Sequence, residues 1–428
     1  MSRRYTAWFK QFLFTACTVG ALLTVLAACG GQATTTTSTT SQPRTPIKIG
    51  ISVPLSGDFS ADGKATQQGY QLWADNVNKS GGLLGRQVQL IFANDGSDTN
   101  QVVTDYQKFI ATDKVDLVLG PYSTLLTKPA SKEAARYGYA MLEGSGGGPS
   151  VFTQGLNNVF DVSPPIASQM NGFVQYILSL PADQRPASAA YETEDDPFTQ
   201  PMIDQAKSQL EAGGVKTADY HVYPAETTDF TPIAQRIINS RAQLVVLGSM
   251  LPDIIAEIKA FRQQHFNPKA IIASAGPDQG ASFTGPIGGA NVAEGIFYPN
   301  GWDPSINIPA TPNVPGAISN AQFVQDFIAK FGGSASDISA DSPEAYAAGQ
   351  VLQQAVQKVG SLDNSKIIAE LHSGATFYSI QGLVKFDSTG QNTAGLVYVF
   401  QWQGGQVKTV YPPAQAVAQP EYPKPAWP

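Results

Sequence analysis

Cysteine, histidine and clusters of basic residues are scarce in this sequence of 428 residues. Its two cysteines, Cys17 and Cys29, both lie near the N-terminus, so the rest of the chain has neither a disulfide nor a thiol nucleophile. The three histidines, His221, His265 and His372, are far apart and show no metal-ligand spacing. The net charge is −7, without a basic cluster, which argues against binding to nucleic acid or directly to anionic lipid.

Fingerprints of nucleotide binding and of common hydrolases are also missing. The stretch EGSGGGP, residues 143–149, follows an apolar run as phosphate-binding loops do. A P-loop would continue from Gly148 with Lys and Ser or Thr, but Pro149 and Ser150 follow, and a dinucleotide loop would need glycine where Pro149 stands. No Gly-x-Ser-x-Gly motif occurs either. We therefore expect no cofactor and no resident metal, whereas carboxylate pairs for acid–base chemistry remain an open alternative.

Only one apolar run approaches the length of a membrane span, and it lies at the N-terminus. Arg3, Arg4 and Lys10 precede the apolar residues 12–28, and the run ends in Leu-Ala-Ala-Cys at Cys29. This order is typical of an export signal, and its end resembles the lipobox of bacterial lipoproteins. We expect residues 1–28 to be a lipoprotein signal peptide and Cys29 to carry lipid that anchors an extracytoplasmic protein to the cell membrane. The alternative is an uncleaved membrane anchor.

Two segments have compositions that cannot bury a core. Residues 29–46 are rich in Thr and Ser and predict a flexible tether. Residues 411–428 contain too many prolines for a helix or a central strand and predict a tail.

Between these segments, short β-rich runs alternate with helical patterns, and the alternation restarts once. Such alternation produces parallel sheets covered by helices on both faces. The sequence therefore predicts an α/β protein of two doubly wound, Rossmann-like lobes. The expected strands are 47–53, 87–93, 116–119 and 139–142, then 187–191, 220–223, 244–247 and 270–273. The expected helices are 63–80, 100–112 and 125–137, then 199–213, 231–240 and 252–265.

The last part of the chain follows a different pattern. Helices are expected at 321–331, 343–359 and 366–372, with hairpin-like segments around 384–390 and 396–402. Too few strands accompany these helices for a third sheet, so we expect them to pack back onto the first lobe. In open α/β sheets, ligands bind beyond the carboxyl ends of the strands, which directs attention to the loops that follow each strand.

Several segments, read in order, resemble the branched-chain-amino-acid type of ABC-transporter substrate-binding protein. They are IKIGISVPLSGDFSADG, NKSGGLLGRQVQLIFANDGSD, VDLVLGPYST, EDDPFTQ, TTDFTPIAQRI, LVVLGSMLPDIIAEIKAFR, GANVAEGIFYPNGWDP and SPEAYAAGQVL. The resemblance covers roughly residues 47–404. It implies the type I periplasmic-binding-protein fold, in which two lobes joined by three crossovers close on a ligand like a Venus flytrap.

The resemblance also implies a division of the chain. We expect the first lobe to comprise residues 47–164 and about 299–374, and the second to comprise 165–298 and about 375–410. It implies a monomer that takes a small-molecule ligand to an ABC permease in the membrane.

The first ligand contacts that the resemblance implies lie in two loops of the first lobe. At Gly120–Thr124, the hydroxyls of Ser123 and Thr124 would hold a carboxylate at a helix N-terminus, with Tyr122 as an aromatic wall. Plain N-capping by these hydroxyls is the alternative. In the glycine loop, Ser145, Gly146 and Gly147 match the next ligand-contacting segment, where the family often has Thr or Ser instead of glycine. A loop without a role in binding is the alternative there.

Further candidates follow strands of the second lobe. Asp195 or Asp196 would hold an ammonium or amide group, with Phe198 as an apolar wall. Helix initiation by Asp196 and Pro197 is the competing explanation for this stretch, and three adjacent acids without further spaced ligands do not make a calcium loop. Four residues in other loops, Asp62, Met250, Pro277 and Asp278, are additional candidates.

The sequence thus predicts an extracytoplasmic solute-binding protein of an ABC importer, without enzymatic activity. A ligand sensor of the same fold that signals to a membrane partner is the alternative, and an exported α/β enzyme is a third possibility. Asp278 stands near the family's acid for an α-ammonium group, and Met250 replaces an aromatic residue of some relatives. These departures leave the ligand open among amino acids, amides, ureas and carboxylates.

Overall fold

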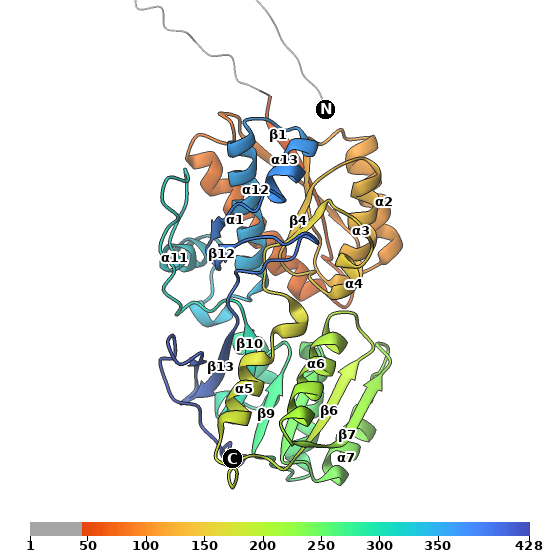
Figure 1. Ribbon diagram of the computed structural model, residues 1–428, viewed down its shortest axis with the longest axis vertical. Helices are drawn as coiled ribbons and strands as arrows, with labels where there is room; N and C mark the ends of the chain where they lie inside the picture. Colours follow the sequence, from red (N-terminus) through yellow and green to blue (C-terminus); the bar gives the residue numbers. More distant parts are fainter. Residues whose placement is uncertain (1–44) are drawn as a thin grey trace, which may run out of the picture. The chain divides into compact units, whose positions relative to one another are not determined.

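A computed structural model describes residues 45–428. The expected signal peptide, the lipidated Cys29 and nearly all of the expected tether lie outside the described residues. Within residues 45–428 the chain forms two β-sheets with helices packed on them and a separate pair of short strands. The predicted α/β class with two sheets of largely parallel strands is confirmed (Figure 1).

The first sheet has the strand order β2-β1-β3-β4-β5, and every pair of neighbours is parallel. The inner strands β1 and β3 form because they are short runs of apolar and β-branched residues that are almost entirely buried, whereas the edge strand β2 is only partly covered. The last strand, β5, has only three residues and was not expected from the sequence. The strands are β1 (Ile47–Val53), β2 (Val88–Asn94), β3 (Leu117–Leu119), β4 (Met141–Glu143) and β5 (Val159–Asp161).

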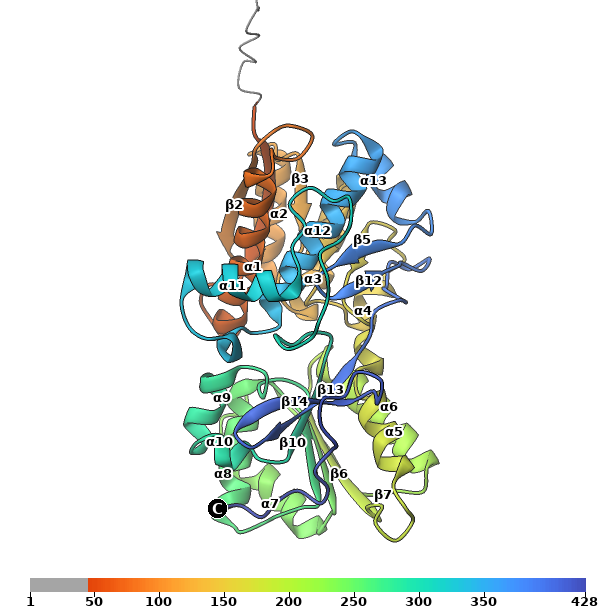
Figure 2. The ribbon, with the colours of Figure 1, turned by 90° about the vertical axis from the view of Figure 1, so that its left-hand side faces the viewer.

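Helices from both ends of the chain cover the first sheet, as the sequence predicted (Figures 1 and 2). The apolar residues of α12 and α13 belong to the same core as those of β1 and α1. The helices from the early part are α1 (Ser60–Lys79), α2 (Thr99–Ala111), α3 (Thr124–Arg136) and α4 (Pro149–Phe152). Those from the late part are α11 (Asn320–Phe331), α12 (Asp341–Val359) and α13 (Asn364–Leu371), with the 3-10 helix η2 (Ala335–Asp337) before α12.

The second sheet has the order β14-β13-β10-β9-β8-β6-β7. Strands β6 to β10 are parallel, and β10 was not expected from the sequence; β13 and β14 add an antiparallel edge that the sequence only partly predicted. The strands are β6 (Ser188–Glu194), β7 (Lys216–Tyr223), β8 (Leu244–Gly248), β9 (Ala270–Ala273), β10 (Ile296–Asn300), β13 (Tyr398–Gln403) and β14 (Gln406–Tyr411). The helices are η1 (Ile166–Ser168), α5 (Asn171–Ser179), α6 (Thr199–Ala212), α7 (Thr231–Ser240), α8 (Leu251–Gln263), α9 (Gly280–Ile287) and α10 (Ala290–Ala293).

The chain passes from one sheet to the other after β5, after β10 and before β13. The last passage lies later than the expected boundary near residue 375. The antiparallel pair β11 (Phe377–Ser379) and β12 (Gly382–Val384) precedes it and packs into the first core, together with Phe386. The apolar side chains of this segment fill space beside α12, which explains why it stays with the first lobe.

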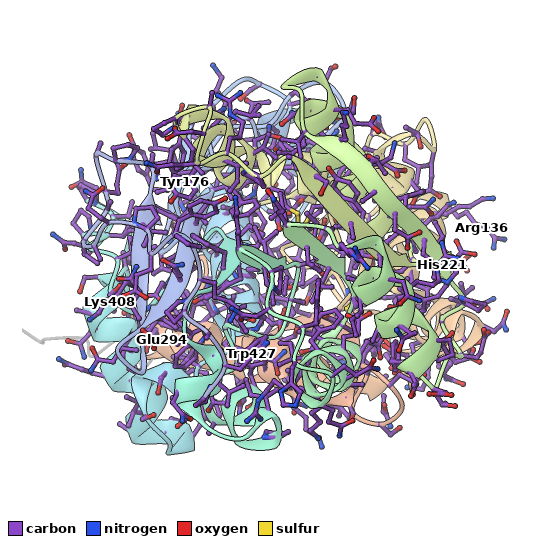
Figure 3. The ribbon with its side chains drawn as sticks, turned by 90° about the horizontal axis from the view of Figure 1, so that it is seen from below. Arg136, Tyr176, His221, Glu294, Lys408 and Trp427 are labelled. Carbon is purple, nitrogen blue, oxygen red and sulfur yellow. The ribbon has the colours of Figure 1, made fainter. Side chains whose placement is uncertain are left out.

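The proline-rich residues after β14 contain neither helix nor strand, yet they are held against the second lobe. The backbone N–H of Lys424 donates to the carbonyl oxygen of Lys269 at 2.6 Å. The indole N–H of Trp427 donates to the carbonyl oxygen of Phe266 at 2.7 Å, on the face that Figure 3 shows. Among residues 45–428, no helix combines the length and the apolar character that crossing a membrane requires.

The packing of α12 along α1 brings the N-terminal ends of both helices together. Ser342 Oγ donates to the carbonyl oxygen of Ala65 at 2.8 Å, and Asn76 Nδ2 donates to Tyr346 Oη at 3.0 Å. Gly69 faces the backbone of α12 so closely that an added Cβ would overlap the carbonyl oxygen of Ser342. The close approach of the two helices therefore depends on a residue without a side chain.

We predict that Gly69→Ala destabilises the protein by about 1–3 kcal/mol, because the methyl group must push α12 away. In a helix without such a contact, the same change stabilises by roughly 1 kcal/mol. Equilibrium urea unfolding measures the difference. Lys64→Ala, at an exposed position of the same helix, is the control and should change the unfolding free energy by less than about 0.5 kcal/mol. Equal or greater stability of Gly69→Ala would contradict this packing.

Candidate functional site

A pocket lies where loops at the carboxyl ends of strands from both sheets meet. The first lobe contributes the start of α1, the loop after β3, the glycine loop after β4 and the start of α12. The second lobe contributes the loops after β6, β8 and β9 and the end of β10. Parallel sheets place their loops in this way because all of their carboxyl ends point to one edge.

Seven of the residues expected from the sequence line this pocket. They come from six different segments of the chain, so the fold alone brings them together. They are Asp62, Tyr122, Ser123, Ser145, Phe198, Met250 and Asp278.

Three expected residues of the first lobe lie just behind the pocket wall. The hydroxyl of Thr124 is fully buried and accepts a hydrogen bond from the backbone N–H of Gly148 at 3.0 Å. The N–H of Gly146 donates to Glu143 Oε2 at 2.6 Å, and Gly147 packs on the carboxyl group of Asp161. These residues shape the loop, whereas Gly144 and Ser145 are the loop residues that reach the pocket.

Two expected residues of the second lobe are not among those that line the pocket. Asp195 is exposed to solvent. The neighbouring Asp196 accepts hydrogen bonds from the backbone N–H groups of Phe198 and Thr199, which confirms its role in helix initiation. The carbonyl oxygen of Pro277 accepts a hydrogen bond from Trp402 Nε1 at 2.9 Å, so this residue supports the loop after β9.

Glycines are needed in the loop after β4 because its backbone is pressed between neighbouring elements. A Cβ on Gly144 would overlap the backbone of Glu344, and one on Gly146 would overlap the side chain of Thr127. A Cβ on Gly148 would overlap Thr124. The run EGSGGGP is therefore a close-packed loop that joins α3 and α12 to the pocket wall.

Ser123 combines an unusual backbone with a position in the pocket. Its φ is 72°, in the left-handed region that non-glycine residues seldom adopt. Its Oγ accepts a hydrogen bond from the N–H of Leu126 at 3.3 Å and so caps α3. Backbone strain of this kind gathers at functional sites, and the capping that the sequence offered as an alternative is present at a residue that also lines the pocket.

Four carboxyl groups line the pocket, from Asp62, Asp278, Asp341 and Glu344. Burial raises the pKa of Asp62 to about 6, with a further contribution from the charge of Asp278. Burial also raises the pKa of Glu344 to about 8, although a hydrogen bond from Ser145 lowers it. Burial raises the pKa of Asp341 well above its usual range, and the charges of Asp62 and Glu344 act in the same direction. The pKa of Asp278 is raised by burial as well.

Hydrogen bonds connect these carboxyl groups to both lobes. Gln279 Nε2, from the second lobe, donates to Asp62 Oδ1 of α1 at 3.0 Å. Ser145 Oγ donates to Glu344 Oε2 at 2.7 Å and so ties the glycine loop to α12. The bond between Gln279 and Asp62 crosses the pocket from one lobe to the other and fits a site that closes by bringing the lobes together.

The sequence did not identify Gln169, Gln279, Asp341 or Glu344 as site residues. Asp341 and Glu344 occupy the first turn of α12, where acids also serve to complement the helix dipole. Because acids are common at this position of a helix, the sequence alone does not indicate that these two also line a pocket. Within residues 45–428, no group of three or more His, Cys, Asp or Glu side chains is arranged to hold a metal ion.

Comparisons with known proteins agree with this architecture. Residues 46–406 match the family model described as periplasmic binding protein. The Leu/Ile/Val-binding protein homolog 3 of Brucella melitensis is 25% identical over 366 residues, covering 84% of this chain and 92% of that protein. The Leu/Ile/Val-binding protein BraC3 of Rhizobium johnstonii is 26% identical over 368 residues, covering 84% of this chain and 93% of that protein.

Solved structures share the fold. The substrate-binding protein LivJ of Streptococcus pneumoniae, in complex with isoleucine, superposes with a TM-score of 0.71 at 18% identity, covering 89% of this chain and 100% of that one. A solute-binding protein of R. palustris in complex with benzoate gives a TM-score of 0.71 at 19% identity, covering 87% and 98%. The family model spans most of the chain, and the two-lobed fold with a pocket at the strand ends accords with it. This chain belongs to the periplasmic binding protein family.

Proposed function

We propose that this protein is the extracytoplasmic solute-binding component of an ABC importer. It captures a small polar solute between its two lobes and delivers it to a membrane permease. The observation that carries this proposal is the pocket at the carboxyl ends of strands from both sheets, with the hydrogen bond between Gln279 and Asp62 across it. The relatives named Leu/Ile/Val-binding proteins, which match over most of their length, support the same role.

The ligand contacts that we propose are the residues on the pocket wall. Ser123 and Ser145 offer hydroxyls, and Tyr122 and Phe198 offer aromatic surface. Asp62, Met250 and Asp278 complete the set that the sequence suggested. Thr124, Gly146 and Gly147 would act through the shape of the glycine loop instead of by direct contact.

Closure on the solute explains how such a protein works without catalysing a reaction. A ligand that contacts both lobes is bound more tightly by the closed form than by the open form, so its binding shifts the population toward closure. The permease then distinguishes loaded from empty protein by their shapes. Lipid on Cys29 would keep a monomer beside its permease and outside the cytoplasm.

A thermal-shift screen of the full chain tests this function. The panel contains amino acids, small amides, ureas, carboxylates and amines. A solute present at one hundred times its dissociation constant should stabilise the protein by about 2.7 kcal/mol and raise the melting temperature accordingly. If no small solute of any of these classes raises it, the proposed function is contradicted.

We predict that Ser145→Ala weakens binding of the solute found in that screen by roughly fivefold or more. The change removes a hydroxyl from the pocket wall together with the hydrogen bond to Glu344, and one hydrogen bond contributes about 1 kcal/mol. Isothermal titration calorimetry measures the dissociation constant. Ser80→Ala, at an exposed position, is the control and should bind like the unaltered protein. Full affinity in Ser145→Ala would remove this residue from the site.

A further inference from the structure

The side chains on the pocket wall that can carry a full charge near neutral pH are all acidic. Asp62, Asp278, Asp341 and Glu344 line it, and no Lys, Arg or His among residues 45–428 does so. Buried carboxylates are unfavourable unless they are paired with positive charge or hydrogen-bond donors. Hydrogen bonds reach all four, from Ser145 to Glu344, from Gln279 to Asp62, from Ser339 to Asp341 and from backbone N–H groups to Asp278, but none of these donors carries a positive charge. The protein alone therefore offers no positive charge to this wall, and burial raises the pKa of all four carboxyl groups.

A second layer of acids lies behind the glycine loop, and burial raises the pKa of these carboxyl groups as well. Glu143 and Asp161 are completely buried. Glu143 Oε1 and Asp161 Oδ2 have no hydrogen-bond partner within the described part of the chain. The ionisable groups that face Glu344 from the surrounding elements are all acids or phenols: Glu143, Asp161, Asp278, Asp341, Tyr70 and Tyr122.

An independent feature, the side chain of Gln169, also points to a polar ligand. Gln169 follows η1, lines the pocket and is only 8% exposed. Its backbone N–H is bonded to the carbonyl oxygen of Ile166, but its side-chain amide has no partner among residues 45–428. Its amide atoms are not sealed from solvent, so they are open to hydrogen bonds from the pocket. A ligand in the pocket would supply what this amide lacks.

We propose that the solute is a small organic cation with N–H donors and more positive than negative charge, such as a basic amino acid, a diamine or a guanidine. This inference rests on the proposed function and specifies its substrate class. Ammonium and guanidinium groups provide charge and hydrogen-bond donors together, which is what carboxylates accept most strongly. Quaternary ammonium ions lack the donors. A metal ion does not suit the described residues, whose acidic side chains are not grouped as ligands.

Proton release on binding distinguishes a cation from a neutral solute. With a pKa of about 8, Glu344 is largely protonated at neutral pH in the empty pocket, and Asp62, with a pKa of about 6, is partly so near pH 6. A cation favours the charged carboxylates, so its binding expels protons. The affinity for a cation must therefore rise as the pH rises from 6 toward 9, over which range amines and guanidines stay charged.

Calorimetric titration of the full chain with a matched panel tests the inference. The panel contains lysine, ornithine, arginine, putrescine and agmatine, with leucine, isoleucine and benzoate as the neutral and anionic members. We expect at least one cation to bind a hundredfold or more tightly than any of the other three. Its dissociation constant should fall about tenfold between pH 6 and pH 8. Titrations in two buffers of different ionisation enthalpy should show proton release.

Two outcomes separate this inference from the function on which it rests. If leucine, isoleucine or benzoate binds and no cation does, the inference is wrong and the solute-binding function stands. If no member of the panel and no solute of the wider screen binds, the function fails as well. Cation binding without proton release and without pH dependence would also overturn the role assigned to the buried carboxyl groups.

Variants locate the effect in the pocket. Glu344→Gln and Asp341→Asn keep the size of each side chain and remove its charge, and each should weaken the best cation at least tenfold and flatten its pH dependence. Glu226→Gln, at an exposed site outside the pocket, is the control for the loss of one carboxylate. Unchanged cation affinity in both pocket variants would contradict the inference.

Discussion

The close approach of the glycine loop to α3 and α12 is the constraint on which the site depends. The loop follows β4, the central helices lie against it on two sides, and its glycines leave no room for side chains. Only because the backbone is this close can Ser145 reach Glu344, which lies 199 residues away in the sequence. The same contact fixes Gly148 on the hydroxyl of Thr124. A loop that resembled a phosphate cradle is thus a packing element that presents one hydroxyl to the pocket.

Much of the fold could be predicted because local patterns are strong. Apolar strand runs, beginning with Ile47–Val53, alternate with helical patterns along the first lobe. Nearly every expected strand and helix is present within a few residues of its expected position. Strand β5 was missed because a run of three residues is too short to show a periodic pattern. Helix α5 was missed because it is short and lies beside a crossover between the lobes. The expected boundary near residue 375 differs from the structure because Phe377 and Phe386 pack into the first core. This packing depends on tertiary contacts that the local sequence does not show.

The site could be predicted only in part, for a related reason. Tyr122, Ser145 and Met250, which line the pocket, were expected because topology places loops after strands at one edge and the family resemblance directed attention to residues within those loops. Asp341 and Glu344 were missed because their position depends on α12 returning to α1 from the far end of the chain. The direction in which a hydroxyl group points could not be predicted from the sequence either. Ser123 lines the pocket, whereas Thr124, one residue later, turns toward the glycine loop.

Partly buried carboxyl groups on the pocket wall determine its chemistry and which ligands it can hold. Residues from both lobes meet there, and Gln279 bonds to Asp62 across the gap. A solute that satisfies the carboxyl groups and the amide of Gln169 at once must contact both lobes, and such contacts favour the closed form. Recognition and closure are therefore two consequences of one arrangement of polar groups.

Hydrogen–deuterium exchange of the full chain, with and without its tightest-binding solute, tests the central claim most directly. If the solute is held between the lobes, backbone amides of the glycine loop at 144–148 and of the first turn of α12 become protected together with those around Gln279 in the second lobe. Protection confined to one lobe, or absent from all three segments despite saturating solute, would contradict the account.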